Sequence, residues 1–87
     1  MNYFMLDQVA REDILNSAMT RLRGRYIALI HGEEKSQNPS REKIQFYRER
    51  CKEITEEYRT IFNQTDSFKE AAIEKYSKEL NKFSQSS

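Results

Sequence analysis

The sequence predicts an all-α fold, in which two long helices form an antiparallel hairpin and a third helix follows at the C-terminal end. Apolar residues recur at helical spacing along three segments. The 87 residues include only two glycines and one proline, too few for the turns of a β-sandwich or β-barrel. The chain is also short enough for only one domain, expected over residues 1–83 with a frayed polar tail at 84–87.

The first helix is expected over about residues 7–31. Asp7 is a suitable N-cap, and Gly32 suits the left-handed position just past the helix end. Gly24 lies within the segment and weakens a helix, which predicts either a kink or the close approach of a neighbouring backbone. The apolar stripe of this helix consists of Leu15, Met19, Leu22, Tyr26 and Leu29.

The second helix is expected over about residues 39–63. Asn38 provides an N-cap residue, and Pro39 suits the first helical position. A helix of this length needs a long partner to bury a narrow apolar stripe, and the short connection makes the first helix that partner, antiparallel to it. The stripe has the 3,4 spacing of a heptad seam and consists of Ile44, Tyr47, Cys51, Ile54, Tyr58 and Ile61.

The third helix is expected over about residues 67–83. Ser67 and Glu70 have the spacing of a capping box at its start. The helix can dock on its own hairpin, giving a three-helix bundle, or on another copy, giving a helix-swapped oligomer. The sequence also leaves open whether the second and third helices are continuous. The apolar face consists of Phe68, Ala72, Ile73, Tyr76, Leu80 and Phe83.

The charge and hydropathy of the chain exclude several classes of protein. The net charge is only +1, and acidic and basic residues are mixed along the whole chain, so no basic tail is present to bind nucleic acid. No apolar run approaches the ~20 residues of a membrane span, and the N-terminal segment lacks the pattern of a signal peptide. We therefore expect a cytoplasmic protein without a membrane partner.

The second helix carries the main candidate site. Its basic residues fall within about 40° of one another on a helical wheel and form a row, here called the basic stripe. Such a row suits a partner with an acidic surface, although a purely solvated face is the simpler interpretation. Phe46 lies outside the apolar seam among charged residues, and is either a contact for the third helix or part of a partner site. The basic stripe consists of Arg41, Arg48, Lys52 and Arg59.

A second basic cluster lies in the first helix and consists of Arg21, Arg23 and Arg25, of which Arg21 and Arg25 are one turn apart on a shared face. Together with the basic stripe, these arginines give an alternative function: a dimer that binds nucleic acid. No helix-turn-helix spacing or aromatic RNA-binding motif accompanies them.

Residues for catalysis are scarce, because the chain has one histidine, one cysteine and no glycine-rich phosphate loop. His31, Glu33 and Glu34 could bind a divalent ion, but a solvated helix end explains them more simply. We expect no enzyme activity, no cofactor and no metal. The first hypothesis is a small helical module that binds another protein in order to inhibit or recruit it, with a homodimer as one assembly that the heptad seam permits.

Overall fold

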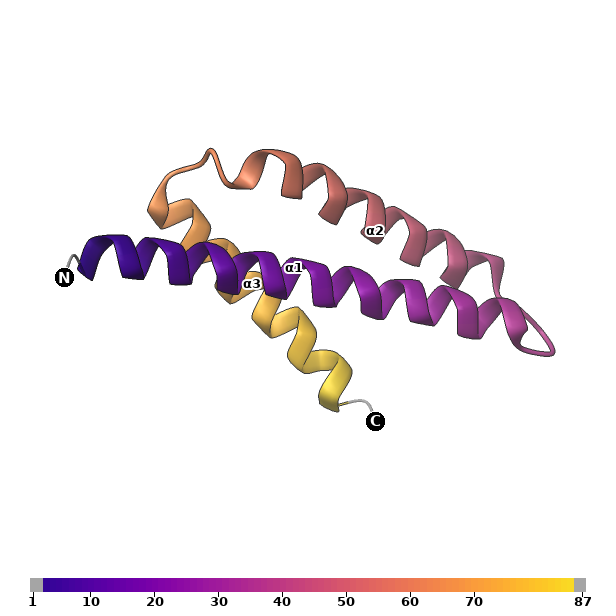
Figure 1. The fold of residues 1–87 in the computed structure, drawn as a ribbon. Helices are drawn as coiled ribbons and strands as arrows, with labels where there is room; N and C mark the ends of the chain where they lie inside the picture. Colours follow the sequence, from indigo (N-terminus) through magenta and orange to yellow (C-terminus); the bar gives the residue numbers. More distant parts are fainter. Residues whose placement is uncertain (1–2, 86–87) are drawn as a thin grey trace.

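The computed structural model describes residues 3–85, with side chains from residue 8 to residue 83. It contains the helices α1 (Tyr3–Lys35), α2 (Arg41–Ile61) and α3 (Asp66–Gln85), and no strand within the described residues (Figure 1). The predicted all-α class is confirmed. α2 and α3 are separate helices, which resolves the alternative that the sequence left open.

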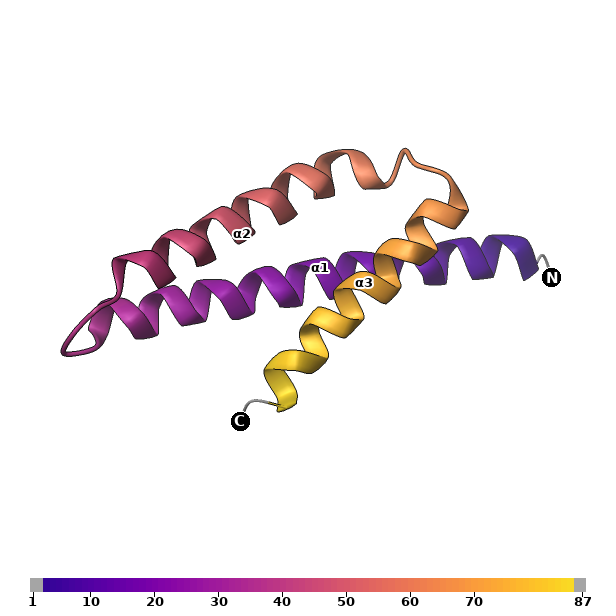
Figure 2. The same ribbon diagram turned by 180° about the vertical axis from the view of Figure 1, so that it is seen from behind.

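α1 is the central helix of the bundle. α2 runs antiparallel beside it, and α3 crosses one face of it, as the two opposite views show (Figures 1 and 2). Both α2 and α3 pack on α1, whereas they make few contacts with each other. The third helix therefore docks on its own hairpin, and the opposite face of the α1–α2 pair is left uncovered. This uncovered face is here called the open face.

The hydrophobic core follows the predicted apolar stripes. Ile54 and Ile61 of the heptad seam are buried, whereas Tyr58 at the same seam is 40% exposed and donates a hydrogen bond to Asn16 at 2.6 Å. One face of α1 contributes most of the core because it packs against two helices at once. The buried apolar residues are Leu15, Ala18, Met19, Leu22, Tyr26, Ile54, Ile61, Ala72 and Tyr76.

α1 is longer than the predicted segment 7–31 at both ends. Asp7 lies inside the helix and not at its N-cap. Gly32 is also helical, and neither glycine has a positive φ, so the predicted left-handed end at Gly32 is wrong. The helix continues to Lys35 because Ser36 satisfies the Glu33 carbonyl, through its hydroxyl at 2.7 Å and its backbone N–H at 3.2 Å.

Gly24 is not a site of close approach. A Cβ atom built at this position would meet no atom within 4 Å, and α1 runs through it as one continuous helix. The prediction of a kink or a tight crossing at Gly24 is therefore wrong. This glycine only weakens the helix, because it adds backbone entropy to the unfolded chain.

α2 begins two residues after the predicted start. Its N-cap is Ser40, whose hydroxyl accepts a hydrogen bond from the Lys43 N–H at 3.3 Å. The Ser40 N–H in turn donates to Oε1 of Glu33 in α1 at 2.8 Å. Because a side chain from the preceding helix completes the cap, the helix begins after Ser40, and Asn38 and Pro39 remain in the connecting turn.

α2 ends at Ile61, and not at residue 63 as predicted. Asn63 and Gln64 donate their backbone N–H groups back to the carbonyls of Thr60 and Ile61, both at 3.1 Å. These i,i+3 hydrogen bonds close the last turn and satisfy its free carbonyl groups.

α3 begins at Asp66 and is capped by Thr65, whose hydroxyl accepts a hydrogen bond from the Phe68 N–H at 3.2 Å. The predicted capping box of Ser67 and Glu70 is therefore wrong. Glu70 instead accepts a hydrogen bond from Arg11 of α1 at 2.9 Å. At the other end α3 continues through Gln85, so the predicted frayed tail is helical at 84–85, and residues 86–87 lie outside the described residues.

Ion pairs join the start of α3 to α1. Lys69 is the one buried charged residue among those described; its side chain is only 4% exposed, and its ammonium group lies 2.8 Å from Oε1 of Glu12. Arg11 adds a second link through Asp66 and Glu70. Together these pairs fix the start of α3 across α1 and determine which face of the hairpin stays open.

Candidate partner-binding surfaces

The basic stripe of α2 lies along the open face. All four of its members are exposed. Arg48 forms an ion pair with Glu34 of α1 at 3.5 Å, whereas Arg41, Lys52 and Arg59 form none with any described residue. The predicted row of cations is therefore exposed to solvent, and three of its four members form no ion pair within the described part of the chain.

A small cavity opens between α1 and α2 on the same face. It has a volume of about 220 Å³, and its lining includes Met19 and Ile54, which belong to the core and are at most 1% exposed. Thr55 lies one helical turn from both Lys52 and Arg59 of the basic stripe, so cations flank the cavity mouth. The lining residues are Met19, Thr20, Arg23, Ile54, Thr55 and Tyr58.

The arginines of α1 are divided between two faces. Arg21 and Arg25 line a shallow depression with Ser77 and Leu80 of α3. Arg23, which lies about 160° from both on a helical wheel, instead lines the cavity on the open face. The structure therefore does not place Arg21 and Arg25 beside the basic stripe. Arg23, the third arginine of this cluster, lies there instead. The sequence did not mark Arg23 as a candidate site residue, although its offset from the other two arginines is visible on a helical wheel.

Phe46 lies on the other side of α2, about 120° to 160° around the helix from the members of the basic stripe. Its ring contacts those of Tyr26 and Tyr47, with centroids 6.5 Å and 5.9 Å away, yet 57% of the residue stays exposed. Phe46 and the basic stripe are thus parts of two different surfaces.

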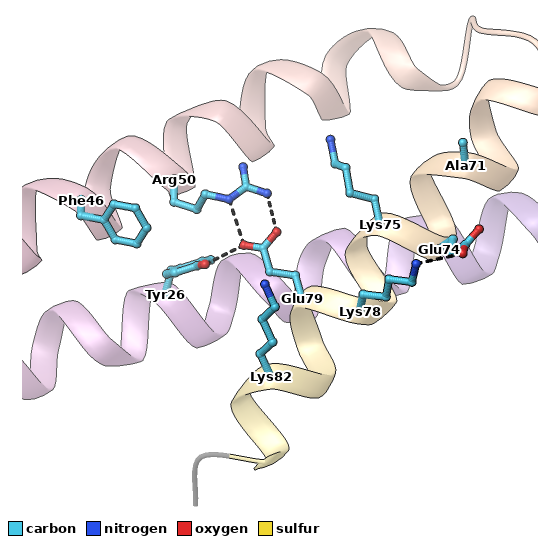
Figure 3. A pocket seen from close by; sticks show the side chains of 9 residues that line it. All are labelled: Tyr26, Phe46, Arg50, Ala71, Glu74, Lys75, Lys78, Glu79 and Lys82. Atoms are coloured by element: carbon cyan, nitrogen blue, oxygen red, sulfur yellow. Dashed lines mark hydrogen bonds and ion pairs between the residues drawn. The ribbon is translucent and has the colours of Figure 1, made fainter.

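Phe46 borders a groove that runs between α2 and α3 (Figure 3). The groove has a volume of about 810 Å³ and exists because α2 and α3 both pack on α1 but make few contacts with each other. Four of its lining side chains are cationic and two are acidic. The lining residues are Tyr26, Phe46, Arg50, Ala71, Glu74, Lys75, Lys78, Glu79 and Lys82.

Arg50, Glu79 and Tyr26 form a polar cluster inside this groove, and Figure 3 shows the three side chains converging from α2, α3 and α1. Arg50 donates two hydrogen bonds to the Glu79 carboxylate, at 2.6 Å and 2.9 Å, and the Tyr26 hydroxyl donates a third at 2.6 Å. Sequence reasoning missed this cluster. The only signal was that Arg50 follows the out-of-place Phe46 by four residues, on the same side of α2.

The cluster shifts the ionisation of its members. Burial opposes the ionisation of Glu79, but the hydrogen bonds from Arg50 and Tyr26 outweigh it and hold the pKa of the carboxyl below its usual range. Burial, followed by the hydrogen bond to Glu79, raises the pKa of Tyr26 far above its ordinary value. Glu79 is therefore a stable anion at neutral pH and Tyr26 a stable hydroxyl donor, as a structural link requires.

The described residues contain no group of three or more His, Cys, Asp or Glu side chains that could hold a metal ion. His31 lies 3.9 Å from Glu34, and Glu33 is engaged in capping α2. Burial raises the pKa of the Cys51 thiol, which keeps this half-buried side chain in its unreactive protonated form.

No protein-family model, curated protein or solved structure matches the chain. Within the described residues, no helix is both long enough and apolar enough to span a membrane. Function is therefore inferred from the two surfaces described above, the open face and the groove.

Proposed function

We propose that the protein is a small interaction module whose open face binds an acidic segment of a partner protein, and thereby inhibits or recruits that partner. The observation that carries this proposal is the cavity between α1 and α2, which reaches buried Met19 and Ile54 and is flanked by Lys52 and Arg59, cations that form no ion pair with any described residue.

The cavity supplies an anchor point. Protein interfaces obtain most of their binding energy from a few side chains that fill desolvated pockets. A cavity of about 220 Å³ with apolar core residues in its lining suits one apolar side chain of a partner. Tyr58 and Arg23 also line the cavity, and both residue types are enriched in interfaces because they combine a large contact area with a polar group.

The basic stripe supplies orientation and selectivity. Lys52 and Arg59 lie one turn from the cavity residue Thr55, and Arg48 continues the row towards the loop between α1 and α2. Acidic side chains on both sides of an apolar anchor would meet these cations. Such complementarity accelerates association and excludes partners of the wrong charge.

The alternative function, a dimer that binds nucleic acid, would sum the arginines of α1 and α2. Arg21 and Arg25 lie beside α3, on the other side of α1 from Arg23, which lines the cavity of the open face. An acidic row that includes Glu49 and Glu56 also adjoins the basic stripe on α2 and would repel phosphates. These features favour an acidic protein segment over a nucleic acid.

The test begins with partner capture from the host lysate and continues with the purified partner. R48E/K52E should weaken binding at least about tenfold while leaving the melting temperature nearly unchanged, because exposed ion pairs contribute only ~0 to 1 kcal/mol to stability. Thr20→Trp should fill the cavity and weaken binding to a similar degree. K78E/K82E, which changes the net charge equally but lies in the groove, is the matched control.

The two halves of the proposal can fail separately. A partner whose affinity is unchanged in R48E/K52E would remove the basic stripe from the site, and one that tolerates Thr20→Trp would remove the cavity. If the protein instead binds DNA or RNA with an affinity that falls steeply with salt, and R48E/K52E abolishes that binding, the alternative function is correct.

A further inference from the structure

The walls of the groove between α2 and α3 have the spacing of a helix-packing surface. α3 presents Phe68, Ala71, Lys75, Lys78 and Lys82 at intervals of 3, 4, 3 and 4 residues, the repeat of a heptad seam. α2 faces them with Phe46, Arg50 and Glu57 at matching positions. Two helices with such rows leave room for a further helix between them, because side chains of the added helix can enter the spaces along each row.

Among the described residues, long polar side chains bridge this groove. Arg50 of α2 pairs with Glu79 of α3 at 2.6 Å, and Lys75 of α3 pairs with Glu57 of α2 at 3.3 Å. A smaller depression of about 240 Å³, which shares Ala71 and Lys75 with the groove, extends it towards Phe68. The surface thus continues along much of α3.

Two exposed aromatic side chains belong to this surface. Phe46 lines the groove and is 57% exposed, and Phe68 lines the adjoining depression and is 49% exposed. Two half-exposed aromatic side chains in one continuous depression are typical of a surface that binds another molecule.

The chain itself carries a complementary helix face. The outward side of α2 bears an acidic row around Phe46, here called the acidic ridge. Three of its members, Glu42, Glu49 and Glu56, form no ion pair with any described residue, although Gln45 donates a hydrogen bond to Glu49 at 3.0 Å. The fourth, Glu53, lies 3.8 Å from Arg50. The groove in turn has an excess of cationic over acidic side chains in its lining, although Lys78 pairs with Glu74 within α3 at 3.1 Å. An acidic helix face with an aromatic anchor and a groove with this excess of cations therefore occur in one molecule.

We infer that the occupant of the groove is the acidic ridge of a second copy of this chain. The contact is reciprocal: each copy supplies one ridge and one groove, as an interface with twofold symmetry requires. In this dimer the glutamates of one α2 lie against Lys78 and Lys82 of the partner's α3. The two Phe46 rings, one from each copy, become buried in the interface. The open face is on a different side of α2, so both copies of it stay accessible in the dimer. The inference therefore does not rest on the proposed function.

Sedimentation velocity of the full chain tests this inference over a wide range of concentrations. We expect a monomer–dimer equilibrium that weakens with added salt, because charge pairs across the interface are screened. K78E/K82E and E42K/E49K should each raise the dimer dissociation constant at least about tenfold. An equimolar mixture of these two variants should restore association as a heterodimer, which also shows that both variants are folded.

Two further variants locate the interface. Phe46→Ala should weaken the dimer, whereas R48E/K52E, which alters the open face by the same charge, should leave it unchanged. The inference is overturned if the wild type stays monomeric, if the mixed variants do not associate, or if R48E/K52E is the variant that dissociates the dimer. It is also overturned if a monomeric wild type binds a partner protein that only K78E/K82E loses, because the groove then holds that partner.

Discussion

Arg50 and Glu79 join α2 to α3 through a two-pronged ion pair, with the guanidinium and carboxylate groups 2.6 Å and 2.9 Å apart at their two contacts. The two side chains are 17% and 18% exposed. Because α2 and α3 otherwise make few contacts, this pair has a large share in setting the width of the groove between them.

Glu79→Gln should lower the free energy of unfolding by about 1.5 to 3 kcal/mol at neutral pH, the range for hydrogen bonds to a charged group. The pKa of Glu79 is lower in the folded protein than in the unfolded chain, so its contribution is present above the ordinary glutamate pKa of about 4.3 and is lost as the pH falls through the folded value. Urea unfolding of both proteins over a pH series measures this. A stability difference that grows in acid would contradict the assignment.

Tyr26→Phe and Tyr76→Phe form a matched pair. The Tyr26 hydroxyl donates to Glu79 at 2.6 Å, whereas the buried Tyr76 hydroxyl makes no hydrogen bond of good geometry with any described residue, although burial and the nearby Glu57 carboxylate raise its pKa. We expect Tyr26→Phe to destabilise the protein by about 1.5 to 3 kcal/mol and Tyr76→Phe to be neutral or stabilising. Thermal and urea unfolding distinguish them. Equal losses would mean that the Tyr76 hydroxyl is also bonded in solution.

Ile54→Ala should cost about 2 to 5 kcal/mol, because this side chain is 1% exposed at the centre of the hairpin. Glu53→Ala, one residue earlier on the exposed surface, should cost at most about 0.5 kcal/mol, since its ion pair with Arg50 is long at 3.8 Å. Chemical denaturation of the two variants gives the comparison. Similar losses from both would show that the wrong face of α2 has been assigned to the core.

Gly24→Ala should stabilise the protein by roughly 0.5 to 1 kcal/mol. Gly24 is helical, and the added Cβ would meet nothing within 4 Å, so only the gain in helix propensity remains. A Cβ at Gly32 would also meet nothing within 4 Å, so Gly32→Ala should raise the free energy of unfolding by a similar amount. A lower midpoint of urea unfolding in either variant would reveal a close contact at that position.

The helix ends were the least predictable part of the fold. Gly32 and Asn38–Pro39 have the residue types of a helix stop and a helix start, yet α1 continues past Gly32 and α2 begins after Ser40. The deciding contact is the hydrogen bond from Ser40 to Glu33, which joins two helices and which no local sequence pattern contains. Similarly, the N-cap of α3 is Thr65 and not Ser67. Several neighbouring residues are of types that can cap a helix, so residue type alone does not decide which one does.

The candidate surfaces also include features that the sequence predicts and features that it does not. Helical spacing alone identified the basic stripe from Arg41 to Arg59 and the unusual position of Phe46, since both depend only on positions along one helix. The cavity beside Arg23 and the groove around Arg50 and Glu79 each need side chains from two or three helices. Their residues lie far apart in the chain; Tyr26 and Glu79, which are hydrogen-bonded, are 53 positions apart.

The sequence by itself determined the three helices, the face of each that is apolar and the heptad seam that pairs the first two, because these follow from residue type and a period of 3.6 residues. Only the tertiary structure decided which side of the hairpin α3 covers. That choice depends on contacts between residues far apart in the chain, such as Lys69 with Glu12 and Arg11 with Glu70. Such contacts join two helices, so the residue pattern of one helix does not predict them. It leaves the basic stripe on an open face and Phe46 in a groove.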